Sequence, residues 1–329
     1  MKQTTLFSIV VVVVQLATGL IVEAQQPKKV PRLVYISGGG SASAPEEGFK
    51  GLDSALRELG YVDGQSIVIE RRDAEGHLDR IPALVNEVIQ QNPDVIVAPN
   101  NVAIRAAQKG TKHIPIVLTS SVDPVAAGYV KSLAHPGGNL TGVASLAREL
   151  SAKRIELLKE IIPKFSRLAI LWDTDGPGPK VAFKEYQAAA TAFKVRLHSL
   201  GIHGPNPDLE DVLRKIAERA DAIIVVVNPL TRAYKQKIME TLTNQRIPSM
   251  VEDSEFLVHG GVVYYGADSI AVWKRAAAQV VQILKGTKPA DIPVEQPTKF
   301  ALVFNLKTAN EVGVVIPPNV LARADRVIR

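Results

Sequence analysis

The stretch RLVYISGGGSASAPEEGFKGLDSALRELGY, which runs from Arg32 to Tyr61, decides the fold class of this chain. It opens with a run of β-branched and aromatic residues, passes through Gly38-Gly39-Gly40 and small hydroxyl residues, and continues as an amphipathic helical pattern that stops at Gly60. A strand, a glycine-rich loop and a helix N-terminus in this order form a cradle for an anionic or polar ligand. Such a cradle can serve a cofactor for a reaction, or it can simply bind a ligand.

Strand-like and helical patterns alternate through the rest of the first half of the chain. We expect strands at Leu33–Ser37, Ile67–Arg71, Asp94–Ala98 and Ile116–Thr119, with helices at Glu46–Leu59, Leu78–Gln91 and Val102–Lys109 between them. This β-α-β-α order predicts a parallel sheet that is covered by helices on both faces.

The second half of the chain repeats the first. The segment PRLVYIS at Pro31 matches SRLAILWDT at Ser166, and NPDVIVAPNNVAIRAAQKGTKHIPIVL from Asn92 matches RADAIIVVVNPLTRAYKQKIMETLTNQRIPSMV from Arg219. Each longer block contains an Asp, a buried strand, a turn with Asn and Pro, a helix, and Ile-Pro before another strand. The shared order predicts an α/β fold of two similar doubly wound parallel-sheet domains that are joined by a hinge.

Turn signals mark the connections between and after the repeats. Pro136-Gly137-Gly138-Asn139 lies where the first repeat ends, and we expect it to lead into the first crossing between the domains. After the second repeat we expect a strand in HGGVVYYGAD, a helix from Ser269 to Leu284, a proline-containing linker and a strand at Phe300–Asn305. Pro318 is placed for the first turn of a terminal helix.

The N-terminus has the pattern of a secretory signal peptide. Lys2 precedes an apolar run from Leu6 to Val22, and Val22-Glu23-Ala24 offers the small residues of a cleavage site before Gln25. We therefore expect residues 1–24 to be a signal peptide and the mature chain to be periplasmic. The alternative is an uncleaved membrane anchor, because the apolar run is nearly long enough to span a bilayer.

Length, composition and charge exclude several classes of protein and of functional site. The chain has 329 residues, enough for about two domains at the usual ~100–200 residues each. It has no cysteine, which excludes disulfides, thiolate metal sites and a cysteine nucleophile. The formal charge is +6, but the basic residues are scattered and no helix-turn-helix pattern precedes the first strand, so we expect no nucleic-acid partner.

Motifs for catalysis, metals and cofactors are missing from the sequence. Gly38-Gly39-Gly40-Ser41 departs from G-x-G-x-x-G, although Glu70 is placed as a ribose-binding acid would be. The six histidines do not form H-E-x-x-H, and both G-x-S-x-G and S-x-x-K are absent. We expect no catalytic residue, no metal site and no cofactor. A nucleotide-dependent two-domain α/β enzyme is the alternative that the glycine loop leaves open.

Polar and aromatic residues follow the predicted strands in both domains, at the sheet edge where doubly wound folds bind ligands. Backbone N–H groups near Ser41–Ser43 suit a carboxylate, Asp123 an ammonium group, and Trp172 an apolar or aromatic body. The alternative is that these residues only cap helices or start turns. The candidate ligand-binding residues are Gly39, Ser41, Ser43, Asn100, Ser121 and Asp123 from the first domain, and Trp172, Asp173, Asn228 and Glu252 from the second.

Three long segments together resemble a known family. They are VPRLVYISGGGSASAPEEGFKGLDSALRELGYVDGQSIVIERRDAEGHLDRIPALVNEVI, IPIVLTSSVDPVAAGYVKSLAHPGGNLTGVASL and EQPTKFALVFNLKTANEVGVVIPPNVLARADRVI. They look like the ABC-transporter substrate-binding proteins that are related to the tryptophan and tyrosine binders. The Asp123-Pro124 pair and the segment from Pro136 to Gly142 are the most specific parts of the likeness.

The resemblance implies a type I periplasmic-binding-protein fold, with three crossings and a ligand that is trapped by hinge closure. It places the N-terminal lobe at 30–143 plus 268–296 and the C-terminal lobe at 144–267 plus 297–329. The family's ligand loops would fall on Gly38–Ser43, Asn100, Ser121 and Asp123, and more loosely on Asn228 and Glu252. It implies a monomer that delivers a small organic solute, such as an amino acid or aromatic compound, to an ABC permease in the inner membrane. A ligand-sensing domain without transport is a further alternative.

Overall fold

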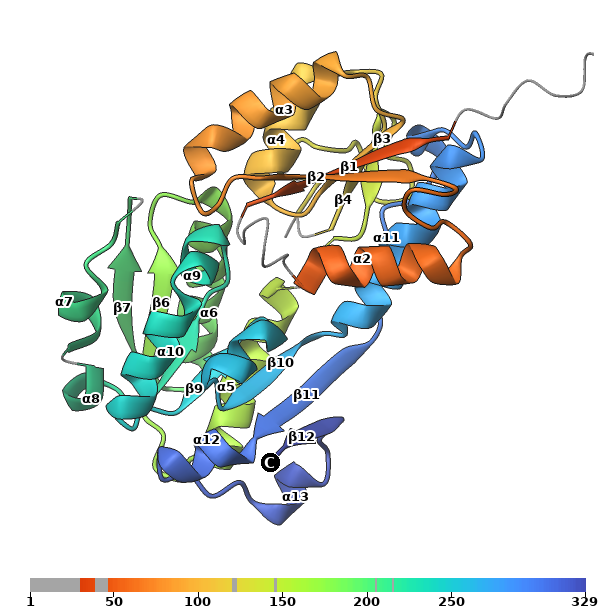
Figure 1. Cartoon of the computed structure of the whole chain (residues 1–329). Helices are drawn as coiled ribbons and strands as arrows, with labels where there is room; N and C mark the ends of the chain where they lie inside the picture. The colour runs from red at the N-terminus through yellow and green to blue at the C-terminus, as the bar shows by residue number, and fades with distance from the viewer. Residues whose placement is uncertain (1–29, 39–46, 120–122, 145–146, 205, 215) are drawn as a thin grey trace, which may run out of the picture.

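The computed structural model describes residues 30–38, 47–119, 123–144, 147–204, 206–214 and 216–329. Within this part the strands form two separate sheets, shown in Figure 1. We call the five-stranded sheet with its helices the N lobe and the seven-stranded sheet with its helices the C lobe. No helix among the described residues combines the length and the apolar character that a membrane crossing requires.

The N lobe is a parallel sheet with helices on both faces. Its strand order is β2-β1-β3-β4-β5. Alternate β1 residues serve opposite faces: Val34 and Ile36 pack under α3 and α4, whereas Leu33 and Tyr35 pack under α2 and α11. The elements are β1 Arg32–Ser37, α2 Glu47–Glu58, β2 Val68–Asp73, α3 Ile81–Gln90, β3 Val95–Ala98, α4 Asn101–Gly110, β4 Ile116–Leu118, β5 Leu140–Gly142 and α11 Ser269–Leu284.

The C lobe has the strand order β7-β6-β8-β9-β10-β11-β12. Helices α5, α6, α12 and α13 cover one face, and α7, α8, α10 and the short helix η3 cover the other. The strands are β6 Arg167–Asp173, β7 Arg196–Ile202, β8 Ala222–Val225, β9 Ser249–Val251, β10 Val263–Ala267, β11 Phe300–Asn305 and β12 Arg326–Ile328. The helices are α5 Ala147–Ile161, α6 Pro177–Ala192, α7 Leu209–Arg214, α8 Ile216–Arg219, α9 Pro229–Ala233, α10 Lys235–Asn244, η3 Ser254–His259, α12 Leu306–Glu311 and α13 Pro318–Leu321.

The expected pair of similar α/β domains is confirmed. If the first five strands of each lobe are numbered from its own first strand, both sheets have the order 2-1-3-4-5. One contact repeats in detail: Asp94 Oδ2 accepts from the Arg32 backbone N–H at 2.8 Å, and Asp221 Oδ2 accepts from the Arg167 N–H at 2.9 Å. The same aspartate therefore holds the start of the first strand in each lobe.

Some sequence-based expectations need correction. The C-lobe sheet is not fully parallel, because β11 runs antiparallel to β10 and carries β12 with it. Strands β5, β7 and β12 were not predicted. Strand β2 extends to Asp73, so Glu70 lies inside the strand, where its two carboxylate oxygens accept from Arg32 and Arg72. Glu70 is therefore paired and is not placed as a ribose-binding residue.

The chain passes between the two sheets at three places, and hydrogen bonds hold these places together. After β5, Ala144 N donates to Glu295 O, and Glu295 N donates to Gly142 O. After β10, Asp268 N donates to Lys299 O. The first and second crossings therefore both pair with the segment that leads into β11.

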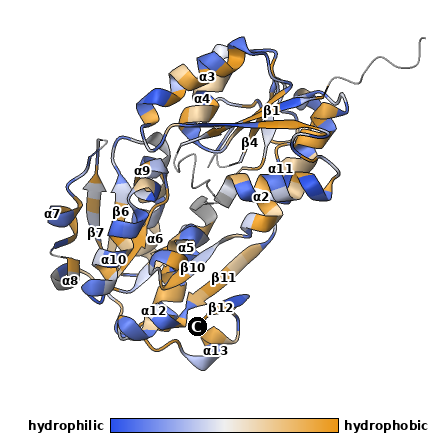
Figure 2. Ribbon diagram, in the orientation of Figure 1, coloured by the Kyte–Doolittle hydropathy of each residue, from blue (hydrophilic) through white to orange (hydrophobic). Residues whose placement is uncertain are grey.

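Figure 2 shows that hydrophobic residues dominate inner strands such as β1 and β11, whereas helices such as α3 and α2 carry both hydrophilic and hydrophobic residues. This is the pattern of a sheet that is buried on both faces under amphipathic helices. Helix α11 illustrates it, since Ala276, Ala277 and Val280 are fully buried against the N-lobe sheet.

Two glycines on α2, Gly48 and Gly51, allow the Trp273 ring of α11 to pack closely against that helix. A Cβ on Gly51 would lie 2.7 Å from Trp273 Cδ1, and a Cβ on Gly48 would lie 2.6 Å from Trp273 Cζ2. Alanine for glycine inside a helix normally stabilises by about 0.5–1 kcal/mol, but overpacking a core costs about 1–3 kcal/mol. We expect Gly51→Ala to lower the free energy of unfolding by about 1 kcal/mol in urea titrations.

The control for this variant removes the clash and keeps the helix. In a Trp273→Leu background the same alanine should be neutral or stabilising, because the indole ring is no longer there. An increase in stability from Gly51→Ala in the natural background would show that Trp273 does not pack closely against Gly51.

Candidate functional site

Each lobe has a switch point, where the chain order of the strands reverses and a crevice opens beyond their carboxyl ends. In the N lobe it lies between β1 and β3, next to Gly38 and Asn100. In the C lobe it lies between β6 and β8, next to Asp173 and Asn228. The fold thus places residues from the two repeats at equivalent positions.

The two switch points face each other. A Cβ on Gly38 would lie 3.0 Å from Asn100 Nδ2 in its own lobe and 3.5 Å from Pro229 Cβ in the other. A Cβ on Gly178 at the start of α6 would lie 2.9 Å from Asn101 Nδ2 across the lobes. We call these carboxyl ends the facing edges. Their residues are close enough to contact a common small molecule.

On the C-lobe edge, Asp173 and Asn228 are bonded to each other. Asn228 Nδ2 donates to Asp173 Oδ2 at 2.8 Å, and both side chains are buried. Asn228 Oδ1 also accepts from the Thr231 N–H at 2.8 Å and caps α9, while Asp173 Oδ1 accepts from the Asp175 N–H at 2.9 Å. These bonds fix both side chains at the switch point and show that each also stabilises the local chain.

On the N-lobe edge, Asn100 is the equivalent of Asn228. Its Oδ1 accepts from the Ala103 N–H at 2.9 Å and caps α4, and the side chain is buried. Asp123 is half-buried and its Oδ1 accepts from the Ala126 N–H at 2.9 Å, which stabilises a turn. The capping and turn roles that the sequence allowed for these residues are therefore present.

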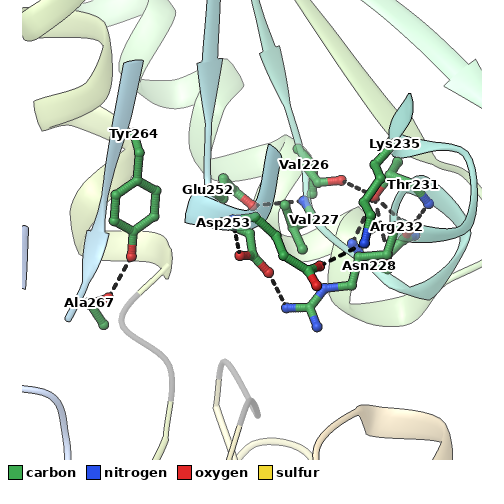
Figure 3. Close-up of polar contacts among 11 residues, drawn as sticks. Val226, Val227, Asn228, Thr231, Arg232, Lys235, Glu252, Asp253, Tyr264 and Ala267 are labelled. Atoms are coloured by element: carbon green, nitrogen blue, oxygen red, sulfur yellow. Dashed lines mark hydrogen bonds and ion pairs between the residues drawn. The ribbon is translucent and has the colours of Figure 1, made fainter. Parts of the chain in front are cut away.

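Glu252 follows β9 and belongs to a buried ionic network. Glu252 Oε1 accepts from Arg154 at 2.9 Å and from the Tyr186 hydroxyl at 2.6 Å, and Oε2 accepts from the Val227 N–H at 3.0 Å. Figure 3 shows this last bond, which holds the segment just before Asn228. Arg154 also donates from Nε to Tyr265 O at 2.8 Å. Both carboxylate oxygens are thus engaged within the C lobe.

The network is deeply buried, which sets its protonation. The Arg154 side chain is 2% exposed and that of Glu252 is 9% exposed. Burial holds the pKa of the Tyr186 phenol well above its ordinary value, so its hydroxyl remains a hydrogen-bond donor. The arrangement braces the C-lobe edge and offers no base beside a free nucleophile.

Ion pairs with the segment that follows β9 also hold α9 and the start of α10 in place. Arg232 of α9 forms an ion pair with Asp253, as Figure 3 shows, and Lys235 at the start of α10 has its Nζ 3.1 Å from Glu255 Oε2. Asp253 in turn accepts from the Glu255 N–H at 2.9 Å. These contacts fix the helix that presents Pro229 to Gly38.

Trp172 and Asp173 are successive residues of β6, so their side chains lie on opposite faces of the sheet. Its ring stacks on Phe183 of α6 with ring centroids 4.4 Å apart, and its Nε1–H donates to Ser199 Oγ at 2.9 Å. The ring packs against the core cluster under α5 and α6. Gly39, Ser41, Ser43 and Ser121, the remaining predicted ligand-binding residues, lie outside the described residues.

Sequence reasoning missed Arg154 and Tyr186. A signal for Arg154 was present, because it stands at the helical spacing of Leu150, Leu157 and Ile161 on the apolar stripe of α5. A charged residue in such a stripe is almost never fully buried unless it is paired. No group of three or more metal-binding side chains occurs in the described portion of the chain.

Two similar lobes, joined by three hydrogen-bonded crossings and facing each other at their switch points, define a two-lobed solute-binding protein. A family model described as ABC transporter substrate binding protein matches residues 34–328. The chain belongs to this family, and it is a binding protein for a small solute of an ABC system.

Several known proteins are similar to this chain. A tyrosine-binding protein of Clostridioides difficile (strain R20291) is 25% identical over 260 residues, which cover 79% of this chain and 74% of the relative. The structure of an ABC domain of Streptococcus pneumonia in complex with L-Trp is 24% identical, with a TM-score of 0.81 over 91% of this chain and 99% of that chain. A ligand-free, open substrate-binding protein of Clostridium difficile is 22% identical, with a TM-score of 0.65 over 91% of this chain and 99% of that chain.

Proposed function

We propose that this protein is a periplasmic receptor that binds an amino acid or a small aromatic compound between its lobes, closes over it, and delivers it to an inner-membrane ABC permease. The observation that carries the proposal is the contact between the two switch points, where Gly38 meets Pro229 and Asn101 meets Gly178. A ligand that contacts both lobes favours the closed state by its differential affinity.

The comparisons support hinge closure. Both relatives match 91% of this chain at nearly equal identity, but the TM-score is 0.81 for the L-Trp complex and 0.65 for the ligand-free, open protein. The lobe arrangement seen here therefore resembles the liganded arrangement more closely. The named tyrosine and L-Trp ligands of these relatives favour an amino-acid-like solute for this chain as well.

The proposal also covers the lobe boundaries, the monomeric state and the signal peptide. We place the lobe boundaries at 30–143 plus 268–296 and 144–267 plus 297–329, in line with the hydrogen-bonded crossings near Ala144, Asp268 and Lys299. The receptor acts as a monomer without catalysis, a cofactor or a nucleic-acid partner. Residues 1–24 act as a signal peptide, and N-terminal sequencing of the exported chain should begin at Gln25.

The ligand can be found by a thermal-shift screen of amino acids, aromatic acids, nucleosides and sugars. A ligand at 100 times its Kd should stabilise the folded chain by about 2.7 kcal/mol. X-ray scattering with and without that ligand should show a smaller radius of gyration in its presence. If nucleotides bind stoichiometrically and are turned over, the enzyme alternative replaces this proposal.

A variant at Gly178 tests closure separately from folding. Because a Cβ there would lie 2.9 Å from Asn101 Nδ2 in the other lobe, Gly178→Leu should block the closed state and leave the open state unstrained. We expect the Kd of the ligand to rise at least about tenfold, or about 1.4 kcal/mol, in calorimetric titrations. The matched control is Lys180→Leu, an exposed position on the same helix, which should leave the Kd unchanged. Unaltered affinity in Gly178→Leu would argue against closure at these contacts.

A further inference from the structure

The outer flank of the C lobe contains a cavity of about 160 Å³. It lies beneath α7 and α8, beside the edge strand β7, on the side of the lobe that Figure 1 shows turned away from the N lobe. None of the facing-edge residues lines it. We call it the flank cavity. It is therefore separate from the proposed solute site.

The local fold explains why this space is left open. His198 and Leu200 are alternate residues of β7, so both point to the face that α7 and α8 cover. These two helices are only 6 and 4 residues long. They fill the space above β7 incompletely, and the apolar part of the remaining wall is formed by Ala169, Leu200, Val212 and Ile216.

Three polar side chains line the same cavity: His198, Asp211 and Arg219. His198 Nε2 is buried and forms no hydrogen bond with any described residue. Asp211 is ion-paired with Arg214, so its charge is compensated. Within the described chain, Arg219 takes part in no ion pair, so its cationic group is available to a ligand.

The charged groups that act on His198 are cationic. Burial, together with Arg196 on the same strand, Arg219 on α8 and Arg167 on β6, lowers the pKa of His198. Asp221 compensates only Arg167, with which it forms an ion pair at 2.7 Å. A neutral His198 can donate or accept one hydrogen bond at Nε2, and the arginines near it favour an anionic partner at this position.

We propose that the flank cavity is a second ligand site, which takes a small aromatic or branched aliphatic carboxylate. The carboxylate pairs with Arg219 and accepts a hydrogen bond from His198 Nε2–H, and the hydrocarbon body fills the apolar wall. The size suits this class, since an apolar cavity of about 150 Å³ is known to bind benzene. Binding here would give a partner to two polar groups that have none among the described residues.

Nuclear magnetic resonance of the His198 ring tests the proposal with benzoate as the probe. A bound carboxylate adds a negative charge beside the imidazole, so benzoate should shift the His198 resonances saturably and raise the pKa of His198. Benzyl alcohol has the same ring but no charge, and it should bind at least about tenfold more weakly. No saturable shift of His198 with millimolar benzoate would overturn the proposal.

Four variants separate this site from others. Arg219→Gln should weaken the benzoate-induced shift at least about tenfold, whereas Arg196→Gln, which removes an equal charge outside the lining, should change it less than about threefold. Ala169→Leu fills the cavity and should abolish the shift without any change of charge. Gly178→Leu should leave the shift intact. Loss of the shift in Gly178→Leu, or its retention in both Arg219→Gln and Ala169→Leu, would assign benzoate binding elsewhere and refute the flank site, while leaving the screen for the solute between the lobes unaffected.

Discussion

Replacing Arg154 with methionine should lower the free energy of unfolding by about 3–5 kcal/mol, because removal of one partner leaves a buried charge uncompensated. Arg154 reaches Glu252 at 2.9 Å, the Tyr186 hydroxyl at 2.8 Å and Tyr265 O at 2.8 Å, and its side chain is 2% exposed. Methionine retains much of the apolar packing, so the loss reports on the charge. Urea unfolding followed by circular dichroism measures it.

An exposed ion pair provides the control. Arg214 pairs with Asp211, but both side chains are about two-thirds exposed, at 66% and 64%. Arg214→Met should therefore change stability by no more than about 0.5 kcal/mol. The double variant Arg154→Met with Glu252→Leu should be less destabilised than Arg154→Met alone, since no charge is then stranded. Equal losses from Arg154→Met and Arg214→Met would show that the network is not the brace described here.

The same variant should also disturb the facing edge. Glu252 holds the Val227 N–H, and Val227 precedes the Asn228 cap that positions α9. Without Arg154 the Glu252 carboxylate would move toward water, and the bond to Val227 would be lost with it. Arg154 thus acts on the edge indirectly, through Glu252.

Replacing Gly142 with alanine should cost about 3 kcal/mol or more, the combined result of about 1–3 kcal/mol of backbone strain and about 1–3 kcal/mol of overpacking. Gly142 has φ +144°, and a Cβ there would lie 2.0 Å from Leu118 O and 2.6 Å from Leu118 N. The backbone of β4 cannot retreat, because Leu118 O also accepts from the Val143 N–H at 2.8 Å. Differential scanning calorimetry should show a lower Tm, or soluble protein should not be obtained.

Gly138 is the matched control, four residues earlier in the same segment. A Cβ on Gly138 would meet no heavy atom within 4 Å, and its φ lies outside the positive region. Gly138→Ala should therefore stay within about 0.5 kcal/mol of the natural chain. A stable Gly142→Ala protein would mean that β5 does not lie against β4 as described. Gly142 also lies at the first crossing, where its carbonyl accepts from Glu295 N at 2.9 Å.

Much of the fold could be predicted because it is encoded locally. Helix α11 and strand β11 have the bounds Ser269–Leu284 and Phe300–Asn305, as the periodicity predicted. The repeat also transferred directly, since Asp94 and Asp221 make the same contact in each lobe. Asn100 and Asn228 could also be recognised from the sequence, because a helix cap is a hydrogen bond between residues three positions apart.

Most strands, helices, caps and turns thus follow from the sequence by itself, since each depends on neighbours within a few residues, although the short or edge strands β5, β7 and β12 were not predicted. Only the tertiary structure showed which side chains at the strand ends lie at the facing edges. Trp172 and Asp173 are successive strand residues that point to opposite faces, and only the packing of α6 showed that the partly buried indole stacks on Phe183 beside the core. Likewise Glu252 finds Arg154 98 positions away, and β11 reverses direction against β10. Such pairings depend on how distant elements pack, a quantity that local periodicity does not contain.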